Sequence, residues 1–249
     1  TMAGRAVAAR VTIEHVALAA GVSRQTVSRV INKGQHVKDA VRARVEAAIA
    51  ELGYVPNLSA RRMGGGRSFL ILAINDRQRT IENWRAGRGN DWVDQMLFGG
   101  MTECEKHGYH LVFELIDTEA DKAPLQLSNS IAALCPDGVI LTPPHSDNDH
   151  LAQMLADRGI ACARIGRRPG DAYIDVFMDE AGAMAEATAK LVELGHRRLA
   201  FIAGSPEYGN SRKRAESFLA TLASCTDSVA GGPVAGQVIK GDFQFDTAA

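Results

Sequence analysis

Residues 11–63 read VTIEHVALAAGVSRQTVSRVINKGQHVKDAVRARVEAAIAELGYVPNLSARRM, and the rest of the chain is organised around this stretch. After Thr12, which stands at an N-cap position, apolar residues recur at helical spacing until Gly21 provides a C-terminal stop. Ser23 can cap a second helix that runs to about Asn32. The pattern therefore predicts two short helices joined by a tight Ala-Gly-Val turn.

The second predicted helix has an apolar side and a polar side. At about 100° per residue, Val27, Val30 and Ile31 fall together. The opposite side carries Arg24, Gln25, Ser28 and Arg29. A third helix over roughly 39–52 has its own apolar face and ends at Gly53. Two short helices propped by a third form a helix-turn-helix arrangement, whose second helix enters the DNA major groove and presents the side chains that read bases.

This head resembles the lac-repressor family of bacterial transcription regulators, through VTIEHVALAAGVSRQTVSRVIN, then VEAAIAELGYVPN and an alanine-arginine tail. The motif is specific because it joins a capped helix, a glycine turn, a polar recognition face, a third helix and a proline-led linker in one order. The resemblance implies a homodimeric repressor that binds a palindromic double-stranded DNA operator. It also implies control by a small-molecule effector, with a sugar or sugar derivative as the leading class.

The charge of the chain is divided unevenly. Residues 1–68 hold 11 Lys and Arg against 4 Asp and Glu, a net charge of +7, whereas the remainder holds 17 against 25, a net charge of -8. A basic head on an acidic body is the pattern expected when only the head meets phosphate.

The cysteines and the amino terminus indicate the cellular compartment of the protein. The four cysteines are far apart, with no Cys-x-x-Cys pair, so we expect buried, reduced thiols and neither a zinc site nor a disulfide framework: Cys104, Cys135, Cys162 and Cys225. The first ten residues, TMAGRAVAAR, lack the apolar core of a signal peptide, and no later run approaches a membrane span. We therefore expect a cytoplasmic protein without membrane contact, metal or cofactor.

A linker follows the head. Pro56 biases the residue before it away from helix, and three glycines at 64–66 end any helix formed by LSARRM. So short a helix is marginal alone in water and forms only when DNA or a partner chain orders it. The resemblance implies a hinge helix, paired across a dimer in the minor groove, with Met63 as an apolar wedge. The residues that the resemblance assigns to the minor groove are Asn57, Ala60, Arg61 and Met63.

From residue 69 onward, strands and helices alternate. The predicted strands are FLILAI, HLVFELI, DGVIL, ACARI and LAFIA, and the predicted helices span about 92–107, 121–134, 147–158 and 180–194. Such alternation specifies a parallel sheet with helices on both faces. This α/β part resembles the periplasmic-binding-protein-like core of the same family, most clearly in LVELGHRRLAFIAGSP.

These patterns predict five segments along the chain. They are a flexible arm (1–10), the helix-turn-helix domain (11–55), a hinge helix and linker (56–67), the amino-terminal subdomain of an effector-binding core (68–176) and a partial carboxyl-terminal subdomain (177–249). Roughly a quarter of a typical family member is missing, so the second subdomain is expected to be incomplete. The chain is then a fragment, a frameshifted product or a truncated one.

Between residues 75 and 91 the resemblance is weakest, and we expect a loop. It carries two tryptophans and several arginines: Trp84, Trp92, Arg77, Arg79, Arg85 and Arg88. A loop after the carboxyl end of a strand lies where ligands bind in open α/β folds. An effector lid and a family-specific surface loop are equally compatible with this segment.

Arg24, Gln25 and Arg29 are the candidates for base readout, because arginine binds a guanine edge bidentately and glutamine an adenine edge. The resemblance places the first two at variable specificity positions and Arg29 at a near-fixed one. It assigns phosphate contacts to Thr12, Ser23, Thr26, Ser28, Asn32, His36 and Tyr54. Helix capping, the structural alternative for Thr12 and Ser23, is compatible with a phosphate contact at the same helix N-terminus.

For the effector, the resemblance implicates two residues. Arg214 in RKRAESFLATL matches the family arginine that clamps a ligand oxygen, and Phe243 matches the aromatic wall against which a sugar or purine packs. Asn75 and Asp76, at the end of the first core strand, are further candidates. The structural alternatives are a surface helix charge for Arg214 and a simple core position for Phe243.

The sequence disfavours two other classes of protein. An enzyme is disfavoured because the chain has no dinucleotide-binding glycine motif, no phosphate loop, no nucleophile elbow and no His-Glu-x-x-His, so no catalytic residue is assigned. A transport-type solute-binding protein of the same core fold would need a signal peptide and would not carry a basic helix-turn-helix head. A DNA-binding transcription regulator is therefore the preferred interpretation.

Overall fold

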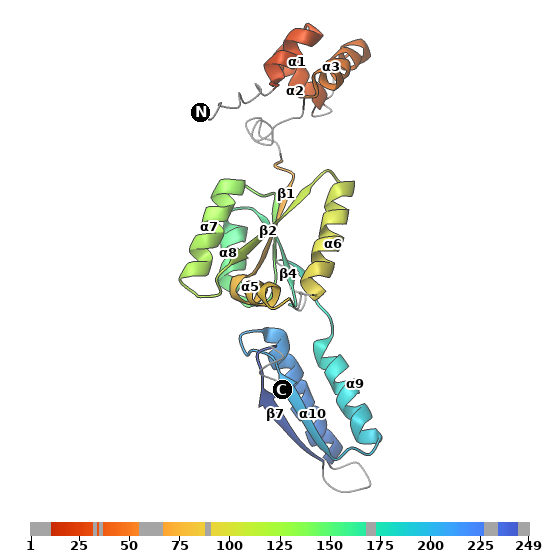
Figure 1. Cartoon of the computed structure of the whole chain (residues 1–249), viewed down its shortest axis with the longest axis vertical. Helices are drawn as coiled ribbons and strands as arrows, with labels where there is room; N and C mark the ends of the chain where they lie inside the picture. Colours follow the sequence, from red (N-terminus) through yellow and green to blue (C-terminus); the bar gives the residue numbers. More distant parts are fainter. Residues whose placement is uncertain are drawn as a thin grey trace, which may run out of the picture. The chain divides into compact units, whose positions relative to one another are not determined.

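The computed structural model describes residues 11–31, 34, 37–54, 67–87, 91–167, 173–226 and 234–243. The chain divides into two compact units, Thr1–Ser68 and Phe69–Ala249 (Figure 1). The predicted hinge helix, with Asn57, Ala60, Arg61 and Met63, lies outside the described residues, as do Asn32, His36 and Arg88.

The first unit contains the three predicted helices. They are α1 (Ile13–Ala20), α2 (Arg24–Ile31) and α3 (Asp39–Leu52). Val16, Val27 and Val45, one from each helix, meet in the centre and expose no surface. Because α1 and α2 have only 8 residues each, they are too short to be stable alone. Their shared apolar contacts therefore hold the head together.

The predicted helix ends are confirmed. Gly21 and Gly53 adopt left-handed backbone conformations, with φ of 60° and 59°, and end α1 and α3. At the start of α2, the Ser23 hydroxyl oxygen accepts a hydrogen bond from the backbone N–H of Thr26 at 3.2 Å. Lys38 precedes α3, and its side chain makes no capping hydrogen bond to the described residues.

The second unit begins with a parallel five-stranded sheet, in the order β2-β1-β3-β4-β5. Its strands are β1 (Leu70–Asp76), β2 (His110–Ile116), β3 (Gly138–Leu141), β4 (Ala161–Ile165) and β5 (Ile174–Val176). One face carries α6 (Asp91–Lys106), and the other carries α7 (Lys122–Leu134) and α8 (Asp149–Asp157) (Figure 1). Leu72, Leu127 and Leu151 are buried between β1, α7 and α8. The predicted parallel sheet with helices on both faces is confirmed.

A second, two-stranded parallel sheet follows in the chain. It pairs β6 (Arg198–Ala203) with β7 (Ala235–Lys240), and α9 (Glu180–Glu193) packs beside α10 (Gly209–Thr226). Val192 on α9 and Phe218 and Leu222 on α10 form the apolar centre of this second sheet and its helices. Neither β7 nor the three-residue β5 was expected, because a strand of three residues shows no measurable alternation and β7 is exposed along its length.

The expected loop between residues 75 and 91 is wrong over most of its length. Residues 77–85 form helix α5 (Arg77–Arg85), and the Asp76 carboxylate caps it by accepting a hydrogen bond from the Arg79 backbone N–H at 3.1 Å. The helix lacks an apolar stripe, since RQRTIENWR is mostly polar, so periodicity could not reveal it. The ring centroid of Trp84 lies 6.3 Å from that of Phe113 on β2.

The expectation of four buried thiols is correct only for Cys162. Cys135 is exposed, and Cys104 and Cys225 are half-buried. Burial raises the pKa of the Cys162 thiol to about 11, so this group stays protonated near neutral pH. Among the described helices, none combines the length and apolar character needed to cross a membrane.

We predict that the apolar centre of the head carries most of its stability. Val16 is 0% exposed and Leu18, on the same helix, is 84% exposed. Val16→Ala should lower the free energy of unfolding of the head by about 2 kcal/mol, because it removes two buried methyl groups and leaves a cavity. Leu18→Ala should change it by less than about 0.5 kcal/mol. Native-state amide exchange of α1–α3 measures both values, and equal effects would contradict this account of the head.

Candidate nucleic-acid interface and effector site

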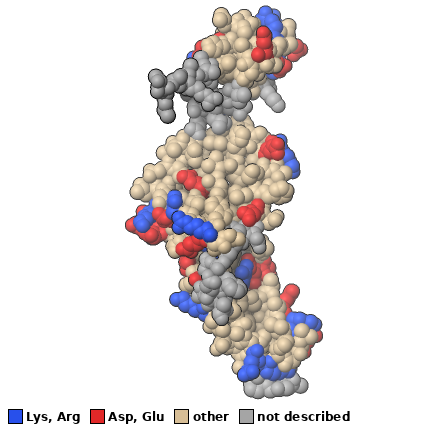
Figure 2. Space-filling model, viewed as in Figure 1, with Lys and Arg blue, Asp and Glu red and all other residues tan. Residues whose placement is uncertain are grey.

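Most of the polar side of α2 is exposed to solvent in the head. Arg24, Gln25 and Arg29 are exposed, whereas Val27 and Val30 on the opposite side are buried. The three candidate base-reading side chains therefore share one exposed surface, as predicted from the spacing. On the face of the second unit that Figure 2 shows, acidic and basic side chains lie intermixed rather than in one basic patch.

Arg24 is held by a residue of the neighbouring helix. Its Nη1 donates a hydrogen bond to Oε1 of Glu14 on α1, at 3.2 Å. Hydrogen bonds from the backbone N–H of Glu14 itself, from Thr12 and from Arg24 lower the pKa of the Glu14 carboxyl. This pair joins α1 and α2 on the exposed side of the head.

The candidate phosphate ligands fall into two groups. Thr12 and Ser23 stand at the starts of α1 and α2, and a helix start favours anions because its first backbone N–H groups have no partner within the helix. The hydroxyls of Ser23 and Thr26 lie 2.9 Å apart, and Ser28 is half-buried on α2. Tyr54 differs, because it is 93% buried in the centre of the head. Its ring is a core element, and a phosphate contact by this residue stays a prediction.

A second cluster lies at the carboxyl end of β1. The Tyr208 hydroxyl donates a hydrogen bond to Oδ2 of Asp76, whose other oxygen caps α5. Burial, followed by this hydrogen bond, raises the pKa of Tyr208, so its hydroxyl remains protonated. The cluster therefore joins the first sheet to the segment that leads into α10.

Phe243 and Arg79 complete this cluster. The Phe243 ring lies 5.3 Å from the Tyr208 ring in an edge-to-face arrangement. The guanidinium of Arg79 lies over both rings, 4.0 Å from the centroid of Phe243 and 5.0 Å from that of Tyr208. Asp76 and Phe243, two effector candidates that are far apart in sequence, are thereby brought together through Tyr208 and Arg79.

The cluster borders a small polar cavity of about 170 Å³. The lining contains four acidic side chains and one basic one: Asp76, Glu82, Glu207, Asp242 and Arg79. Thr118, Ser205 and Tyr208 add hydroxyl groups. The composition provides many hydrogen-bond acceptors beside one fixed cation.

Asn75, unlike Asp76, has its side-chain amide hydrogen-bonded inside the first sheet and its adjoining helix. Its Nδ2 donates to the Thr80 hydroxyl at 2.8 Å, and its Oδ1 lies 2.5 Å from the Thr142 hydroxyl. Because both ends of this buried amide are occupied, Asn75 supports the end of β1. A direct effector contact by Asn75 stays a prediction.

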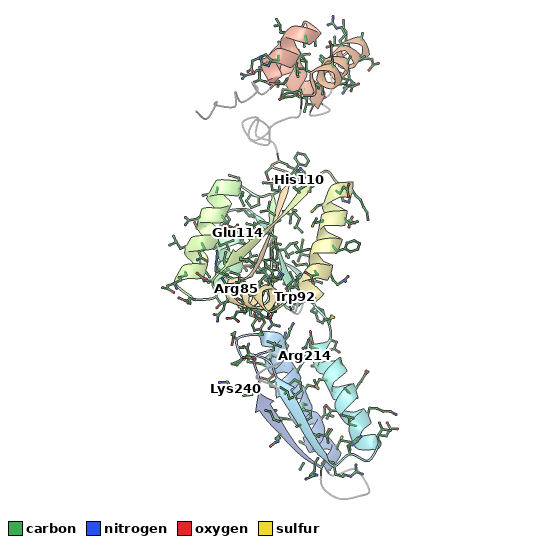
Figure 3. The ribbon with its side chains drawn as sticks, viewed as in Figure 1. Arg85, Trp92, His110, Glu114, Arg214 and Lys240 are labelled. Atoms are coloured by element: carbon green, nitrogen blue, oxygen red, sulfur yellow. The ribbon has the colours of Figure 1, made fainter. Side chains whose placement is uncertain are left out.

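Arg214 belongs to a separate ion pair. Its Nε donates to Oε2 of Glu180, which joins α10 to α9. Figure 3 shows Arg214 on this helix pair, while Arg85 and Trp92 lie at the carboxyl-end edge of the first sheet and His110 lies at the opposite edge. The described contacts link Asp76 to Phe243, but they do not link Arg214 to either.

The fold brings further residues to this edge that the sequence did not mark as site residues. Tyr208 is part of the cluster, and His145 and Ser146 follow β3 at the same edge of the sheet. Arg79 was noted only as one of the arginines of the 75–91 segment. Within the described chain, Nε2 of His145 and Oγ of Ser146 are buried without a hydrogen-bond partner. Buried polar atoms without partners at the carboxyl edge of a parallel sheet are typical of a ligand site. The Pro-Pro-His-Ser sequence after a strand was the available signal.

Both parts of the chain match described protein families. Residues 12–57 match the profile of bacterial regulatory proteins of the lacI family. Residues 89–230 match the profile of periplasmic binding proteins and the sugar binding domain of the LacI family.

Individual proteins agree with these matches. The HTH-type transcriptional regulator CelR of Thermobifida fusca is 33% identical over 248 residues, which cover 96% of this chain and 67% of that protein. The ribose operon repressor of Escherichia coli (strain K12) is 30% identical over 241 residues, or 94% and 67% of the two chains. The lac repressor dimer bound to operator and the anti-inducer ONPF has a similar structure, with a TM-score of 0.73 at 25% identity, covering 94% of this chain and 66% of that one.

The chain spans about two thirds of the length of each of these relatives. Its helix-turn-helix head and its α/β core occur in the same order as the two family profiles. The family consists of transcription regulators rather than enzymes, in agreement with the sequence interpretation. The chain is therefore a DNA-binding transcription regulator and belongs to the lacI family of bacterial regulatory proteins.

Proposed function

We propose that this regulator is a homodimeric repressor that reads a palindromic operator with Arg24, Gln25 and Arg29. The observation that carries the proposal is the exposure of these three side chains on one side of α2, whose other side is buried in the head. A polar helix face on a rigid small unit is the geometry of major-groove readers. Arginine supplies bidentate contacts to guanine and glutamine to adenine.

A twofold dimer accounts for the palindrome. Two identical heads related by a twofold axis bind two inverted half-sites. The similar lac repressor is a dimer on its operator in its crystal structure, which supports the same assembly here. The alternative, a solute-binding protein of the same core fold, leaves the lacI-family head without a role.

The proposed effector is a neutral sugar bound at the Asp76–Tyr208 cluster. Carboxylates accept hydrogen bonds from sugar hydroxyls, a guanidinium donates to ring or hydroxyl oxygens, and aromatic rings pack against the apolar face of a sugar. Asp76, Arg79 and Phe243 supply one group of each kind. The ribose operon repressor and the sugar-binding family profile support this ligand class. We include Arg214 as a second ligand arginine that exchanges Glu180 for an effector oxygen.

The charge of the cavity favours a neutral ligand over an anionic one. Four carboxylates line it against one guanidinium, so a phosphorylated sugar would meet net repulsion. The cavity volume of about 170 Å³ lies below the roughly 300–1,000 Å³ of pockets that bind drug-sized ligands, which favours a small sugar in this conformation.

Base readout is tested by replacing one arginine of α2. Arg29→Ala should cost about 1–3 kcal/mol of operator binding and relax the preference at one base pair, because a bidentate base contact is lost. Thr26→Ala should weaken all sequences alike, since a phosphate contact carries no sequence information. Binding-site enrichment with wild type and each variant measures the preference at every position.

Arg44→Ala is the matched control. Arg44 is exposed on α3, and its replacement removes the same positive charge from the head. If the Arg29→Ala variant selects the same operator as wild type, the wrong face of α2 has been assigned. Enriched sites without inverted half-sites would contradict the dimeric operator complex.

Effector binding is tested on helix α5. Arg79→Ala should weaken the binding of a neutral sugar by roughly tenfold or more, because a charged hydrogen bond is worth about 1.5–3 kcal/mol. The cap of α5 survives this change, since Asp76 bonds the backbone of residue 79. Titration calorimetry with a panel of neutral monosaccharides, disaccharides and sugar phosphates identifies the ligand and its affinity.

Arg85→Ala on the same helix is the control and should leave sugar affinity unchanged. Tighter binding of sugar phosphates than of neutral sugars would contradict the proposed ligand class. Equal losses in the Arg79 and Arg85 variants would place the site elsewhere.

A further inference from the structure

The head contains an acidic side chain beside its candidate base-reading residues. Glu14 on α1 and Arg24 on α2 have side chains that are 57% and 70% exposed, and their charged groups are 3.2 Å apart. Both are therefore accessible to a ligand on the outer surface of the head. An exposed ion pair of this kind adds little to stability, so packing alone does not explain it.

A carboxylate at this position opposes phosphate binding. Glu14 lies in the first turn of α1, two residues after Thr12, a candidate phosphate ligand. Its lowered pKa keeps the carboxyl ionised near neutral pH. A first-turn acid is favourable to the helix dipole, which is the simple structural explanation. That explanation accounts for a carboxylate on α1 but not for its direct bond to Arg24.

The hydrogen-bonding capacity of arginine allows both contacts at once. A guanidinium has five N–H donors, and Glu14 accepts from Nη1 only. Donors on Nη2 and Nε stay available for the two acceptors of a guanine edge. Glu14 therefore limits the orientations of the Arg24 side chain without consuming its base-reading donors.

Arg29 provides an internal contrast. No ion pair of Arg29 is found within the described part of the head, so no described carboxylate offsets its charge. The charge of Arg24 is largely cancelled by Glu14. Two arginines on one helix face therefore differ in their surroundings: Arg24 is paired with a carboxylate, and Arg29 has no such partner among the described residues.

We propose that Glu14 is a positioning residue for base readout, which holds Arg24 toward one base pair and cancels its attraction to phosphate. The inference rests on the proposed reading of an operator by α2. Glu14 makes Arg24 contribute to sequence preference rather than to general DNA affinity. Sequence specificity in this head then depends on a residue of the first helix as well as on the second.

The test replaces the charge of Glu14 while keeping its size and its acceptor oxygen. The 249-residue chain is prepared as wild type, Glu14→Gln, Arg24→Ala, the double variant and Glu51→Gln. Glu51 is exposed on α3, so its variant changes the net charge of the head by the same amount. Binding-site enrichment identifies the base pair that Arg24→Ala relaxes, and titrations with unrelated DNA over a salt series give general affinity.

We expect Glu14→Gln to reduce the preference at that base pair by roughly five- to tenfold, a fraction of what a full bidentate contact supplies. Its affinity for unrelated DNA should rise, and the slope of log affinity against log salt should steepen by about one, as for one added phosphate contact. Glu51→Gln should change neither quantity. A role in helix stability alone would lower binding to all sequences and would not steepen the salt slope.

Two results would overturn the inference while leaving the proposed function intact. One is a Glu14→Gln variant with the base preferences and salt slope of Glu51→Gln. The other is an effect of Glu14→Gln that persists at full size in the Arg24→Ala background, which would mean that Glu14 contacts DNA itself. A wild-type chain that selects no sequence would remove the proposed function, and this inference would fall with it.

Discussion

Burial of Val27 and Val30 sets the rotation of α2 about its own axis, and the proposed base readout depends on that rotation. A turn of about 100° per residue leaves no freedom once these two side chains are in the apolar centre. Arg24, Gln25 and Arg29 must then face outward together. The head is small, so a few fully buried valines determine both its stability and which side of α2 is exposed.

The α/β unit is organised by a comparable constraint at the carboxyl end of β1. One carboxylate, that of Asp76, caps α5 and accepts the Tyr208 hydroxyl. A second carboxylate, that of Asp147, accepts the backbone N–H of Gly209 at 2.9 Å, at the start of α10. Both bonds join the first sheet to the segment that carries α10. Contacts of this kind couple the occupancy of a polar site to the relative position of the elements around it.

The predictable parts of this protein are those in which local pattern and tertiary packing agree. The helices of the head and the strand that runs from Leu70 to Asp76 show strong periodicity or continuous apolar character, and each was predicted to within one or two residues. Helix α5 was predicted as a loop because its polar sequence carries no periodic signal and its cap lies on the preceding strand. Cys135 was expected to be buried but is exposed. A cysteine by itself does not indicate burial unless the residues around it form an apolar pattern.

The sequence by itself determined the helix-turn-helix head, the alternation of strand and helix and the absence of a catalytic motif, because each is a local or periodic property of neighbouring residues. It also offered Asp76 and Phe243 as separate effector candidates, Asp76 from its place at the end of the first core strand and Phe243 through family resemblance. Tertiary structure decided that Tyr208 and Arg79 join them, since 132 positions separate Asp76 from Tyr208 and no periodicity reports such a contact. It likewise decided that Glu14 meets Arg24, because the turn at Gly21 brings two short helices together at an angle that only their shared apolar centre defines.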